Sequence, residues 1–459
     1  MITTAMMIVV ICTLILLIAG YAIAKNYDAK LVLFMAGIVL MLCAAAMGHS
    51  ILPEAATTGS AWLDPLKQIR LEFIKQFGGA GIIIMVLFGF SAYMSSIGAN
   101  NAAIHALSKP ISKIRSPYIL VPVVFWVGTA LSLVVPSASS LAVILMATLY
   151  PILRAANMSS LSAGGVIATT ATIVPTPLGS DNVKAAEMLG FDHVIDYVFS
   201  HHARISIPAI VLMGIVHYFW QRYLDKKQGE KAFTDVDESK LATEGTLPPA
   251  YYALFPVVPL VLIFVSGLFF KHLKIGLVEI TIFSFALAFA VEAIRKKDMK
   301  EQMKRAATFF KGMGEGFSQV VVLIVAAATL VAGLKSMGLI DMISSSVKDF
   351  DNAGVGLMFI FSGLTALITF ISGSGNAVFF SFIEIIPPIA QQANVDPVMV
   401  ALPMQFTSNL IRAVSPVSAV VIIVASVVRV NPLEIVKRTC VPLLSGFVAT
   451  LVLAWIFYA

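Results

Sequence analysis

The chain has 459 residues, of which 59% are hydrophobic and only 12% are charged, and its formal net charge at pH 7 is +6. Because soluble domains carry about 25% charged residues, this composition excludes a soluble globular protein. The apolar runs are roughly long enough to cross a hydrocarbon core of about 30 Å as helices, and the alternating strands of a membrane β-barrel are absent. The composition therefore predicts an all-α polytopic membrane protein.

The apolar stretches, in chain order, cover residues 3–24, 31–50, 79–97, 118–154, 161–190, 205–221, 251–270, 276–294, 312–334, 353–391, 397–428 and 440–458. We expect the first to be a transmembrane helix and not a signal peptide, because no basic residue precedes it and it is too long for a signal-peptide core. Cys12, Cys43 and Cys440 lie inside these stretches and have the spacing of neither a disulfide framework nor a metal site. We therefore expect no cofactor, and no metal other than a sodium ion used for coupling.

Two of these stretches, 118–154 and 353–391, are too long for one crossing and are interrupted at Val134–Ser140 and at Ser372–Asn376. Each begins and ends near polar residues. Irregular backbone at membrane depth survives only where protein or a water-filled cavity satisfies its polar groups. We therefore expect each stretch to form a re-entrant hairpin, made of two half-length helices with a polar tip near the middle of the membrane.

Two further stretches, 161–190 and 397–428, are interrupted at Pro175–Asn182 and at Thr407–Ser418, and each is predicted to be a discontinuous transmembrane helix. Every break ends one half-helix with free carbonyl groups and begins the next with free N–H groups and the positive end of the helix dipole. The four electropositive ends are expected near Ser139, Ser180, Asn376 and Ser415. The four carbonyl ends are expected near Val135, Val174, Ser372 and Leu410.

The segment 222–250 is the only clear polar linker, and it divides the chain into two halves. If the hairpins do not cross the membrane, the loops on the same side of the membrane as this linker contain more than twice as many lysines and arginines as the loops on the opposite side. Positive charge accumulates in cytoplasmic loops. The linker is therefore expected to be cytoplasmic, and both termini are expected to be periplasmic.

The two halves, residues 1–221 and 251–459, match weakly at a spacing of 237 residues, which aligns YPILRAAN (Tyr150–Asn157) with PPIAQQAN (Pro387–Asn394). Five predicted crossings separate these segments, and an odd number reverses the orientation of the second half. Inverted repeats with interrupted helices are typical of secondary transporters. We expect two inverted repeats, each with one hairpin and one broken helix.

The residue types at the breaks suit a carboxylate, because serine, threonine and asparagine donate hydrogen bonds and glycine allows the backbone to approach. Two electropositive poles that face each other across the repeats would suit a small dianion with a carboxylate at each end. The expected substrate-binding residues are Ser137, Ser139, Ser140, Thr176, Ser180, Asn182, Ser374, Gly375, Asn376, Ser408, Asn409, Arg412, Ser415 and Ser418. The candidates for binding a coupling ion, Na⁺ or H⁺, are Asp181, Thr172, Ser372 and Thr407.

Arg412 is the only arginine predicted deep in the membrane, where a guanidinium group is expensive and usually functional. Its planar fork fits a carboxylate. The alternatives are that it snorkels to the interface or pairs with a structural carboxylate such as Glu384. Asp181 either binds a coupling cation or proton or caps the half-helix that follows it. Glu384 itself is expected in an ion pair or facing outward rather than in a proton relay, and metal binding by His201 and His202 is not favoured.

The sequence resembles the DcuC family of anaerobic C4-dicarboxylate transporters of Gram-negative bacteria over nearly its whole length. The segments that carry the resemblance are GFSAYMSSIGANNAA (Gly89–Ala103), LSKPISKIRSPYIL (Leu107–Leu120), LMATLYP (Leu145–Pro151), HYFWQRYLDKK (His217–Lys227), SGSGNAVFFSFIEIIP (Ser372–Pro387), SNLIRAVSPVSAVV (Ser408–Val421) and IVKRTCVP (Ile435–Pro442).

The resemblance implies an inner-membrane carrier of succinate, fumarate and malate that works by alternating access in efflux, uptake or exchange, and it implies a homodimer. It also implies similarity to the ion-transporter superfamily, in which Ser-Asn-Thr motifs at hairpin tips and broken helices hold carboxylates and sodium. The segments TSN (Thr407–Asn409) and SGSGN (Ser372–Asn376) lie at matching places. The first-half counterparts, SASS and TPLGSDN, lack a full triplet, so sodium and proton coupling both stay open.

Three other functions are compatible with a multi-pass membrane chain. The first is an ion-coupled transporter of another small carboxylate or an amino-acid-like anion, and the second is a passive channel. The third is a membrane-embedded enzyme, which is disfavoured because the chain has no His-Glu-x-x-His motif, no Gly-x-Ser-x-Gly motif and no paired intramembrane aspartates. No nucleic-acid partner is expected; the expected surroundings are the lipid bilayer.

Overall fold

The computed structural model describes residues 2–25, 27–111, 114, 116–135, 137–233, 248–269, 275–296, 298–342 and 353–458. Within these ranges every regular element is helical. Eight helical stretches in the described part are long and apolar enough to cross a membrane. The prediction of an all-α polytopic membrane protein is therefore confirmed.

The helices of the first half are α1 (Ile2–Ala24), α2 (Ala29–Ala46), η1 (Glu54–Ala56), α3 (Asp64–Gln76), η2 (Phe77–Gly81), α4 (Ile82–Ser96), α5 (Ala99–Ile111), α6 (Pro117–Ser132), α7 (Ala138–Thr148), α8 (Tyr150–Ala155), α9 (Ser160–Thr169), α10 (Ser180–Met188), α11 (Val194–Tyr197), η3 (Val198–His202) and α12 (Ala203–Gln228). η4 (Gly229–Ala232) lies in the linker. The helices of the second half are η6 (Ala250–Val257), α13 (Val258–Phe269), α14 (Leu277–Arg295), α15 (Met299–Gly316), η7 (Phe317–Val321), α16 (Val322–Ser336), α18 (Ala353–Ser372), α19 (Gly375–Ile383), α20 (Ile386–Gln392), α21 (Pro397–Arg412), α22 (Ala419–Val428) and α23 (Pro432–Tyr458).

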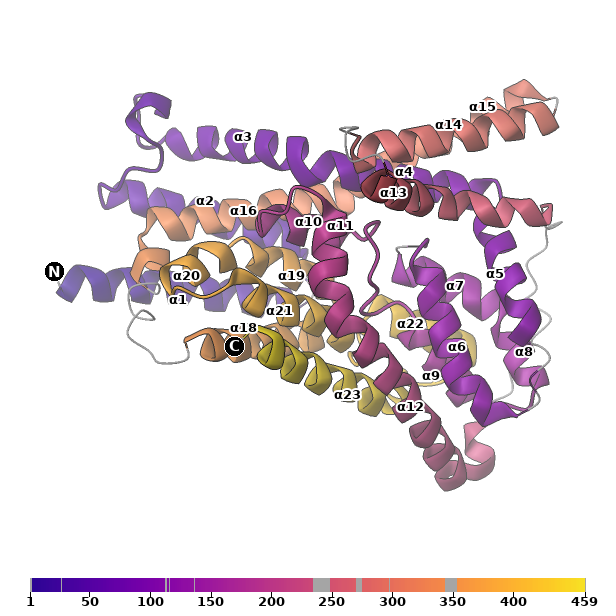
Figure 1. Cartoon of the computed structure of the whole chain (residues 1–459). Helices are drawn as coiled ribbons and strands as arrows, with labels where there is room; N and C mark the ends of the chain where they lie inside the picture. The colour runs from indigo at the N-terminus through magenta and orange to yellow at the C-terminus, as the bar shows by residue number, and fades with distance from the viewer. Residues whose placement is uncertain are drawn as a thin grey trace.

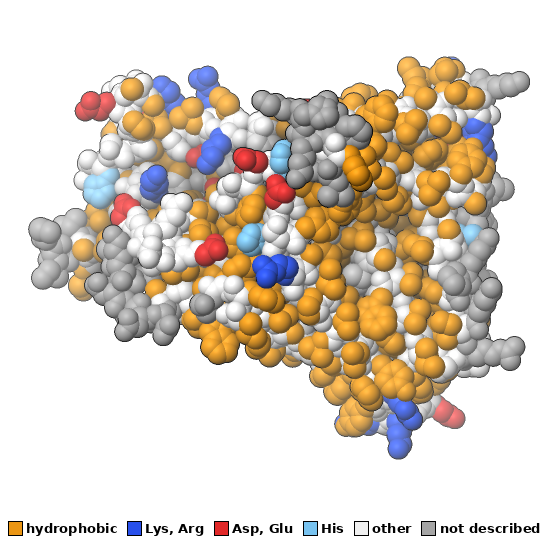
Figure 2. All heavy atoms as spheres, in the orientation of Figure 1, with side chains coloured by type: hydrophobic (Ala, Val, Ile, Leu, Met, Phe, Trp, Pro, Cys, Tyr) orange, Lys and Arg blue, Asp and Glu red, His pale blue; other side chains and the backbone are white. Residues whose placement is uncertain are grey.

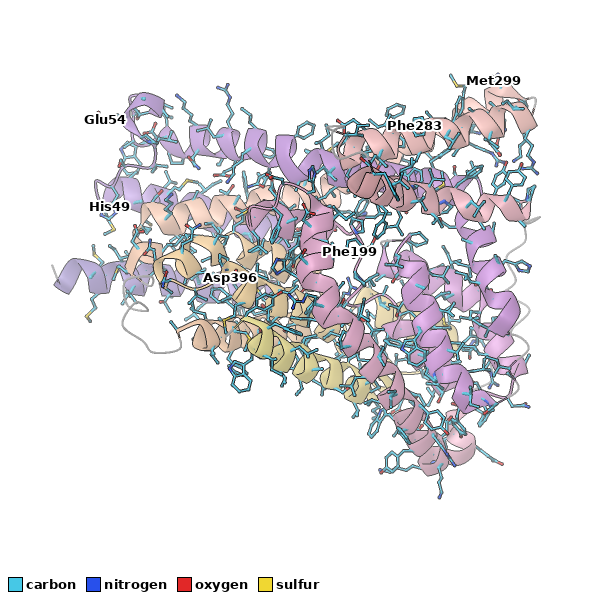
Figure 3. The ribbon with its side chains drawn as sticks, viewed as in Figure 1. His49, Glu54, Phe199, Phe283, Met299 and Asp396 are labelled. Carbon is cyan, nitrogen blue, oxygen red and sulfur yellow. The ribbon has the colours of Figure 1, made fainter. Side chains whose placement is uncertain are left out.

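Two long helical stretches run past each other in opposite directions, and the first is kinked at Gly79. One consists of α3, η2 and α4, and the other of α15, η7 and α16. α3 lies beside α16 and α4 lies beside α15, as Figure 1 shows. Glu54, just before α3, and Met299, at the start of α15, accordingly lie toward opposite ends of the molecule (Figure 3).

The two long helices meet at a matched pair of π-helical turns, η2 and η7. A π turn inserts a residue into the helix and distorts it. The rings of Phe77 and Phe317, the first residues of the two turns, pack edge to face with their centres 6.5 Å apart. Each long helix is followed by a glycine with positive φ, Gly98 at 79° and Gly338 at 78°. The π turns and the glycines therefore lie at matching places in both halves, although η2 also has a kink at Gly79 (φ −89°, ψ −123°) that η7 lacks.

The apolar spans expected at 79–97 and 312–334 are too short, because each helix begins with an amphipathic extension, α3 or α15. Charged residues in these extensions end the hydropathy signal although the helix continues. Packing stabilises α15 on α4 instead, through glycines that let the backbones approach. A Cβ on Gly89 would lie 2.7 Å from the Phe309 carbonyl oxygen, and one on Gly312 would lie 2.6 Å from the Ala92 Cβ.

All four interruptions expected in the sequence are present as breaks between helices. They separate α6 from α7, α9 from α10, α18 from α19 and α21 from α22. Three of the new helices begin within a residue or so of the expected places. The fourth, α22, begins at Ala419 and not near Ser415, because Ser418 caps it by accepting a hydrogen bond from the Val421 backbone N–H at 3.4 Å.

The stretch 353–391 differs from the expected pair of half-length helices. Its first arm, α18, has 20 residues and is therefore about 30 Å long, which is enough to cross a membrane. No proline lies between Ala353 and Ser372, so nothing there forces the helix to end. The arms on either side of this break are thus unequal in length.

The polar linker expected over 222–250 begins as a helix. α12 continues to Gln228, and η4 follows it to Ala232. After residues 234–247, which lie outside the described residues, η6 packs against α5. Part of the segment is held by the buried side chain of Arg438, whose guanidinium group pairs with Asp225 at 2.5 Å.

The weak sequence match at a spacing of 237 residues has a conformational counterpart. Asn157 and Asn394, which the alignment pairs, both adopt positive φ, at 61° and 55°. The next helix on each side, α9 or α21, begins after a side-chain cap at the paired positions Ser159 and Asp396. Positive φ is uncommon for residues other than glycine, so the correspondence is specific.

Hydrophobic side chains cover most of the face drawn in Figure 2. Lysine and arginine side chains gather at the lower tip, where α12 ends, and at the upper left over α3. Large apolar side chains are exposed on many helices, for example Leu17, Phe219, Phe283 and Trp455. Such a surface requires an apolar solvent, and it fits a chain that lies in a bilayer.

Candidate functional site

All four helix breaks contribute to the lining of a small polar cavity of about 50 Å³. The cavity is lined by the end of α6, the irregular segment between α9 and α10, the start of α10, the start of α19 and the end of α21. The lining residues are Ser132, Ala171, Thr172, Val174, Thr176, Gly179, Ser180, Asp181, Asn376, Asn409 and Arg412. The segments come from both halves of the chain, so neither half forms the site alone.

Asp181 connects α10 of the first half to α21 of the second. Its Oδ2 accepts hydrogen bonds from the side-chain amides of Asn409, at 2.7 Å, and Gln405, at 3.0 Å. Gln405 also donates to Asn182 Oδ1 at 2.7 Å and accepts from the Tyr197 hydroxyl group at 2.5 Å. Asp181 is the second residue of α10 and bonds to another helix, so the structure does not support a role as the cap of α10.

Arg412, at the last turn of α21, brings a cation to the same cavity. Its Nη2 donates to the Ala171 carbonyl oxygen at 2.8 Å, which ties α21 to the irregular segment after α9. Its Nε is buried and donates to no acceptor among the described residues. No ion pair with a carboxylate is found for it within the described part of the chain. The guanidinium group therefore keeps hydrogen-bonding capacity for an anion.

The alternative that Arg412 pairs with Glu384 is wrong, because Glu384 pairs with Lys184, at 2.7 Å between Nζ and Oε1. This bears out an ion pair for Glu384, and its side chain is only 6% exposed. His201 and His202 bond to Tyr458 and Ser206, at 2.8 and 3.1 Å. No group of three metal-ligating side chains occurs in the described ranges.

Seven predicted site residues line the cavity, and one more, Asn182, supports its wall. The seven are Thr172, Thr176, Ser180, Asp181, Asn376, Asn409 and Arg412. The Nδ2 of Asn182 donates to the carbonyl oxygens of Val174 at 3.2 Å and Thr176 at 2.8 Å. These bonds hold the irregular segment between α9 and α10 in shape, since its backbone has no helical partners there.

The remaining predicted residues lie outside the lining of this cavity. Ser137, Ser139 and Ser140 begin α7, where the Ser137 Oγ accepts from the Ser140 N–H at 3.3 Å. Ser372 and Ser374 line a different cavity of about 310 Å³ beside the connection from α1 to α2. Four hydroxyl groups are occupied by the chain itself, either bonding to a backbone carbonyl or capping a helix; they belong to Thr407, Ser408, Ser415 and Ser418.

Sequence reasoning missed several residues of the site. Ser132 lines the cavity although it precedes the expected hairpin tip, because α6 ends three residues before Val135, where the sequence places the carbonyl end. Gln405 was missed because it stands inside an apolar helix, yet its side chain is fully buried and carries three hydrogen bonds. A glutamine within a transmembrane helix, one turn before Asn409, was the available signal.

Gly375 lets α19 approach α21 closely enough to place Asn376 beside Asn409. A Cβ on Gly375 would lie only 2.1 Å from the Ser408 carbonyl oxygen. We expect Gly375→Ala to destabilise the protein by about 1–3 kcal/mol, the usual penalty for overpacking. The measurement is the thermal denaturation of the purified protein in detergent.

Gly363→Ala is the matched control, because Gly363 lies in α18 and a Cβ there would meet nothing within 4 Å. It should keep or slightly raise the thermal stability, since alanine favours the helix. Equal stability for both variants would contradict the close approach of α19 and α21.

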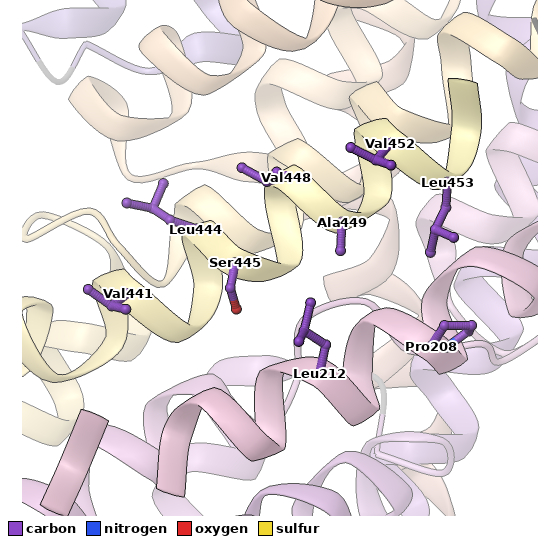
Figure 4. A pocket seen from close by; sticks show the side chains of 9 residues that line it. All are labelled: Pro208, Leu212, Val441, Leu444, Ser445, Val448, Ala449, Val452 and Leu453. Carbon is purple, nitrogen blue, oxygen red and sulfur yellow. The ribbon is translucent and has the colours of Figure 1, made fainter. Parts of the chain in front are cut away.

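A much larger cavity, of about 780 Å³, lies between α12 and α23. Figure 4 shows its nine lining residues, among them Leu212, Leu444 and Val452, and none of them is ionisable. A charged ligand would lose its hydration there without gaining a partner. This groove therefore suits apolar chains, and the small cavity at the breaks is the candidate site for a polar ligand.

The sequence pattern of the family described as "DcuC: C4-dicarboxylate anaerobic carrier" matches residues 6–459 of the chain. The anaerobic C4-dicarboxylate transporter DcuC of Escherichia coli strain K12 is 38% identical over 443 residues, which cover 95% of this chain and 94% of that protein. The probable anaerobic C4-dicarboxylate transporter DcuC of Vibrio cholerae serotype O1 is 36% identical over 452 residues, covering 98% and 97% of the two chains.

Two solved structures have a similar fold. The Alcanivorax borkumensis YdaH transporter has a TM-score of 0.63 at 15% identity and covers 93% of this chain and 98% of its own. Neisseria gonorrhoeae MtrF, an antimetabolite efflux pump, has a TM-score of 0.60 at 15% identity and covers 96% and 97%. At this identity the likeness concerns the fold alone, and both neighbours are membrane transporters.

Proposed function

Because the chain belongs to the DcuC family of C4-dicarboxylate carriers, we propose that it is a secondary active transporter of C4-dicarboxylates such as succinate, fumarate and malate. It is a carrier and not an enzyme. The observation that supports the substrate class best is Arg412, a cation with a free buried donor, in a polar cavity formed by both halves of the chain. Alternating access would carry the dianion across the membrane by efflux, uptake or exchange.

Two groups of donors in the cavity lining, from different helices, suit the two carboxylates of the substrate. One carboxylate would bind Arg412 and Asn409 at the end of α21. The other would lie near Ser180 and Asn376, at the N-termini of α10 and α19, where backbone N–H groups and the helix dipoles favour an anion. Ser137, Ser139, Ser140, Ser408, Ser415 and Ser418 have no part in this arrangement.

The cavity has room for only a few water molecules, so a four-carbon dianion requires the lining elements to move apart. We propose that the present conformation is contracted around an empty site. The hydrogen bonds from α21 to Asp181 and to the Ala171 carbonyl would then rearrange when substrate enters. Binding energy and conformational change are coupled through these contacts.

The charges of the cavity favour a coupling ion. Among its lining residues, Arg412 and Asp181 are the ionisable ones, and their formal charges cancel. A bound dianion would leave two uncompensated negative charges in a buried site, which is costly. A cation or proton at Asp181, with Thr172 beside it, would reduce this excess. Ser372 and Thr407 are less suited, since they lie outside the cavity lining.

We also propose the inverted-repeat architecture, with residues 1–221 and 251–459 as repeats and 118–154 and 353–391 as re-entrant hairpins. It is supported by the matched π turns of the two antiparallel long helices and by the paired positive-φ residues Asn157 and Asn394. The unequal length of α18 means that the second hairpin would be asymmetric.

The membrane orientation and the assembly are proposals too. The positive-charge bias favours the bacterial inner membrane with the linker 222–250 cytoplasmic and both termini periplasmic. Lys184 and Arg438 are buried and do not belong to a loop. Leaving them out removes one positive charge from each side of the membrane, so the difference between the two sides stays the same. A homodimer is proposed from the resemblance alone.

Counterflow in proteoliposomes tests the transport function. Vesicles loaded with unlabelled succinate should accumulate labelled succinate transiently, and external fumarate or malate should compete. Measuring the uptake of labelled succinate with and without a sodium gradient, and with and without a pH gradient, identifies the coupling ion. Flux that does not saturate would instead indicate a channel, and equal competition by monocarboxylates or amino acids would indicate the alternative substrate class.

A further inference from the structure

A fully buried lysine lies outside the dicarboxylate site, one turn further along α10 from Asp181. The side chain of Lys184 has 0% exposure. Its Nζ contacts three acceptors: Glu384 Oε1 at 2.7 Å, Glu187 Oε2 at 2.9 Å and Gln76 Oε1 at 2.7 Å. An ammonium group has three N–H donors, so each has a partner. We name this group of four side chains the Lys184 cluster.

The Lys184 cluster connects two helices that line the dicarboxylate cavity to a helix that does not line it. Lys184 and Glu187 belong to α10, and Glu384 directly follows α19; both helices carry residues of the dicarboxylate cavity. Gln76 ends α3, a part of the long helix that contributes nothing to the cavity lining. Figure 1 shows α10 next to this long helix, near its π turn.

A second contact fixes the same junction. The Oε1 of Glu187 accepts a hydrogen bond from the Ala80 backbone N–H at 3.1 Å, inside the π turn η2. Gly79 makes room for it, since a Cβ there would lie 1.8 Å from this oxygen. If α10 and α19 move away from α3, the contacts with Gln76 and Ala80 break, whereas Lys184 and Glu384 stay together on the moving elements.

The cluster carries more negative than positive charge. Besides Lys184, the groups that face Glu384 are Glu187 on α10 and Glu72 on α3, and Lys75 lies near Glu72 at the exposed side. The Oε2 of Glu72 is buried and has no hydrogen-bond partner among the described residues. Excess carboxylate charge in a buried site is relieved most simply by a proton.

We propose that the Lys184 cluster is a proton-binding site separate from the dicarboxylate cavity, with Glu384 as the acceptor. In the present conformation, the Glu384 carboxylate accepts hydrogen bonds from both Lys184 Nζ, at 2.7 Å, and Gln76 Nε2, at 3.1 Å. When α10 and α19 leave α3, the Gln76 donor is lost. Glu384 then takes up a proton that hydronium ions of the aqueous phase supply, which converts the carboxylate to a carboxylic acid.

Proton uptake and movement of the site are then thermodynamically linked. A proton that binds one conformation more tightly than the other favours that conformation, and the effect is reciprocal. Water has access along Glu187, whose side chain is 31% exposed. The inference rests on the proposed transport function, and it assigns the coupling proton to a place that substrate does not touch.

The test compares two fluxes of the reconstituted full-length protein. Succinate counterflow at equal pH needs no net proton movement, whereas accumulation driven by a pH gradient does. Glu384→Gln should keep counterflow within about threefold of the wild type and lose at least tenfold in pH-driven accumulation. Unchanged pH-driven accumulation, or equal loss of both fluxes, would overturn the proposal. Absence of both fluxes in the wild type would instead refute the proposed function.

Two further variants keep the test independent of folding defects. Glu292→Gln removes another fully buried, ion-paired acid, which bonds to Lys296 at 2.9 Å on α14, and it should change neither flux. Gln76→Met removes the donor to Glu384 and keeps the acid. Without this donor the two conformations no longer differ at Glu384, so pH-driven accumulation should fall while counterflow is kept. Unchanged pH-driven accumulation would contradict the role of Gln76.

Discussion

Arg412→Ala is expected to lower the transport of succinate by at least 30-fold while the protein still inserts into the membrane. Removing one partner of a buried charge pair costs about 2–5 kcal/mol, and the lower value already corresponds to roughly 30-fold in affinity. Among the described side chains that line the cavity, Arg412 alone is cationic and alone has a buried nitrogen without an acceptor, so no other lining side chain can replace its charge. The measurement is labelled-succinate counterflow at a series of succinate concentrations.

Arg412→Lys separates charge from geometry. Lysine keeps the charge but loses the bond from Nη2 to the Ala171 carbonyl and the planar fork that binds a carboxylate at two points. It should recover only part of the lost flux. The control is Arg222→Ala, which removes an exposed arginine at the end of α12. Normal counterflow by a well-inserted Arg412→Ala variant would remove Arg412 from the substrate site.

Asp181→Asn is the second substitution with a large expected effect. It keeps the size of the side chain but removes the charge and one of its acceptor oxygens. Asn409 and Gln405 both donate to Oδ2. If the NH₂ group of the new asparagine took the place of Oδ2, it would face these two donors, and the buried N–H groups would lose their acceptor. Each unsatisfied buried group costs about 1–3 kcal/mol. Counterflow and gradient-driven uptake should both fall at least tenfold, because Asp181 also positions Asn409.

This outcome differs from that of Glu384→Gln, which should spare counterflow. The comparison therefore distinguishes a residue of the dicarboxylate cavity from a residue that only binds a proton. Asp396→Asn is a matched control, because Asp396 caps α21 through the Val398 N–H at 2.8 Å, away from the cavity. If Asp181→Asn transported as the wild type does and kept its ion dependence, Asp181 would be neither a coupling residue nor a positioning residue.

The positions of the helix breaks could be predicted well because they are local. Runs such as SGSGN and TPLGSDN place glycine, proline and helix-capping residues inside apolar stretches, and a single helix cannot continue through them. The amphipathic helices α3 and α15 were missed for the opposite reason. Their helical state depends on packing against α4 and α16, which no local hydropathy window contains.

The partners of the polar side chains could not be predicted, because they depend on which breaks meet in space. Ser415 and Ser418 have the residue types of a binding site, yet one bonds to the Phe370 carbonyl and the other caps α22. Gln405 and Lys184 became important only because α21 and α10 pack where they do. Hydrogen-bond partners up to 308 residues apart, as for Gln76 and Glu384, are beyond the reach of a local pattern.

The sequence by itself determined that the chain is a multi-pass helical protein with four interrupted segments, since composition and helix-breaking motifs act on a few neighbouring residues. It also carried the family resemblance, which the comparisons confirm. Only the tertiary structure decided which interruptions form one cavity, that Asp181 faces α21, and that Glu384 pairs with Lys184 and not with Arg412. A buried polar group must find a partner, and the fold alone decides which partner lies within reach.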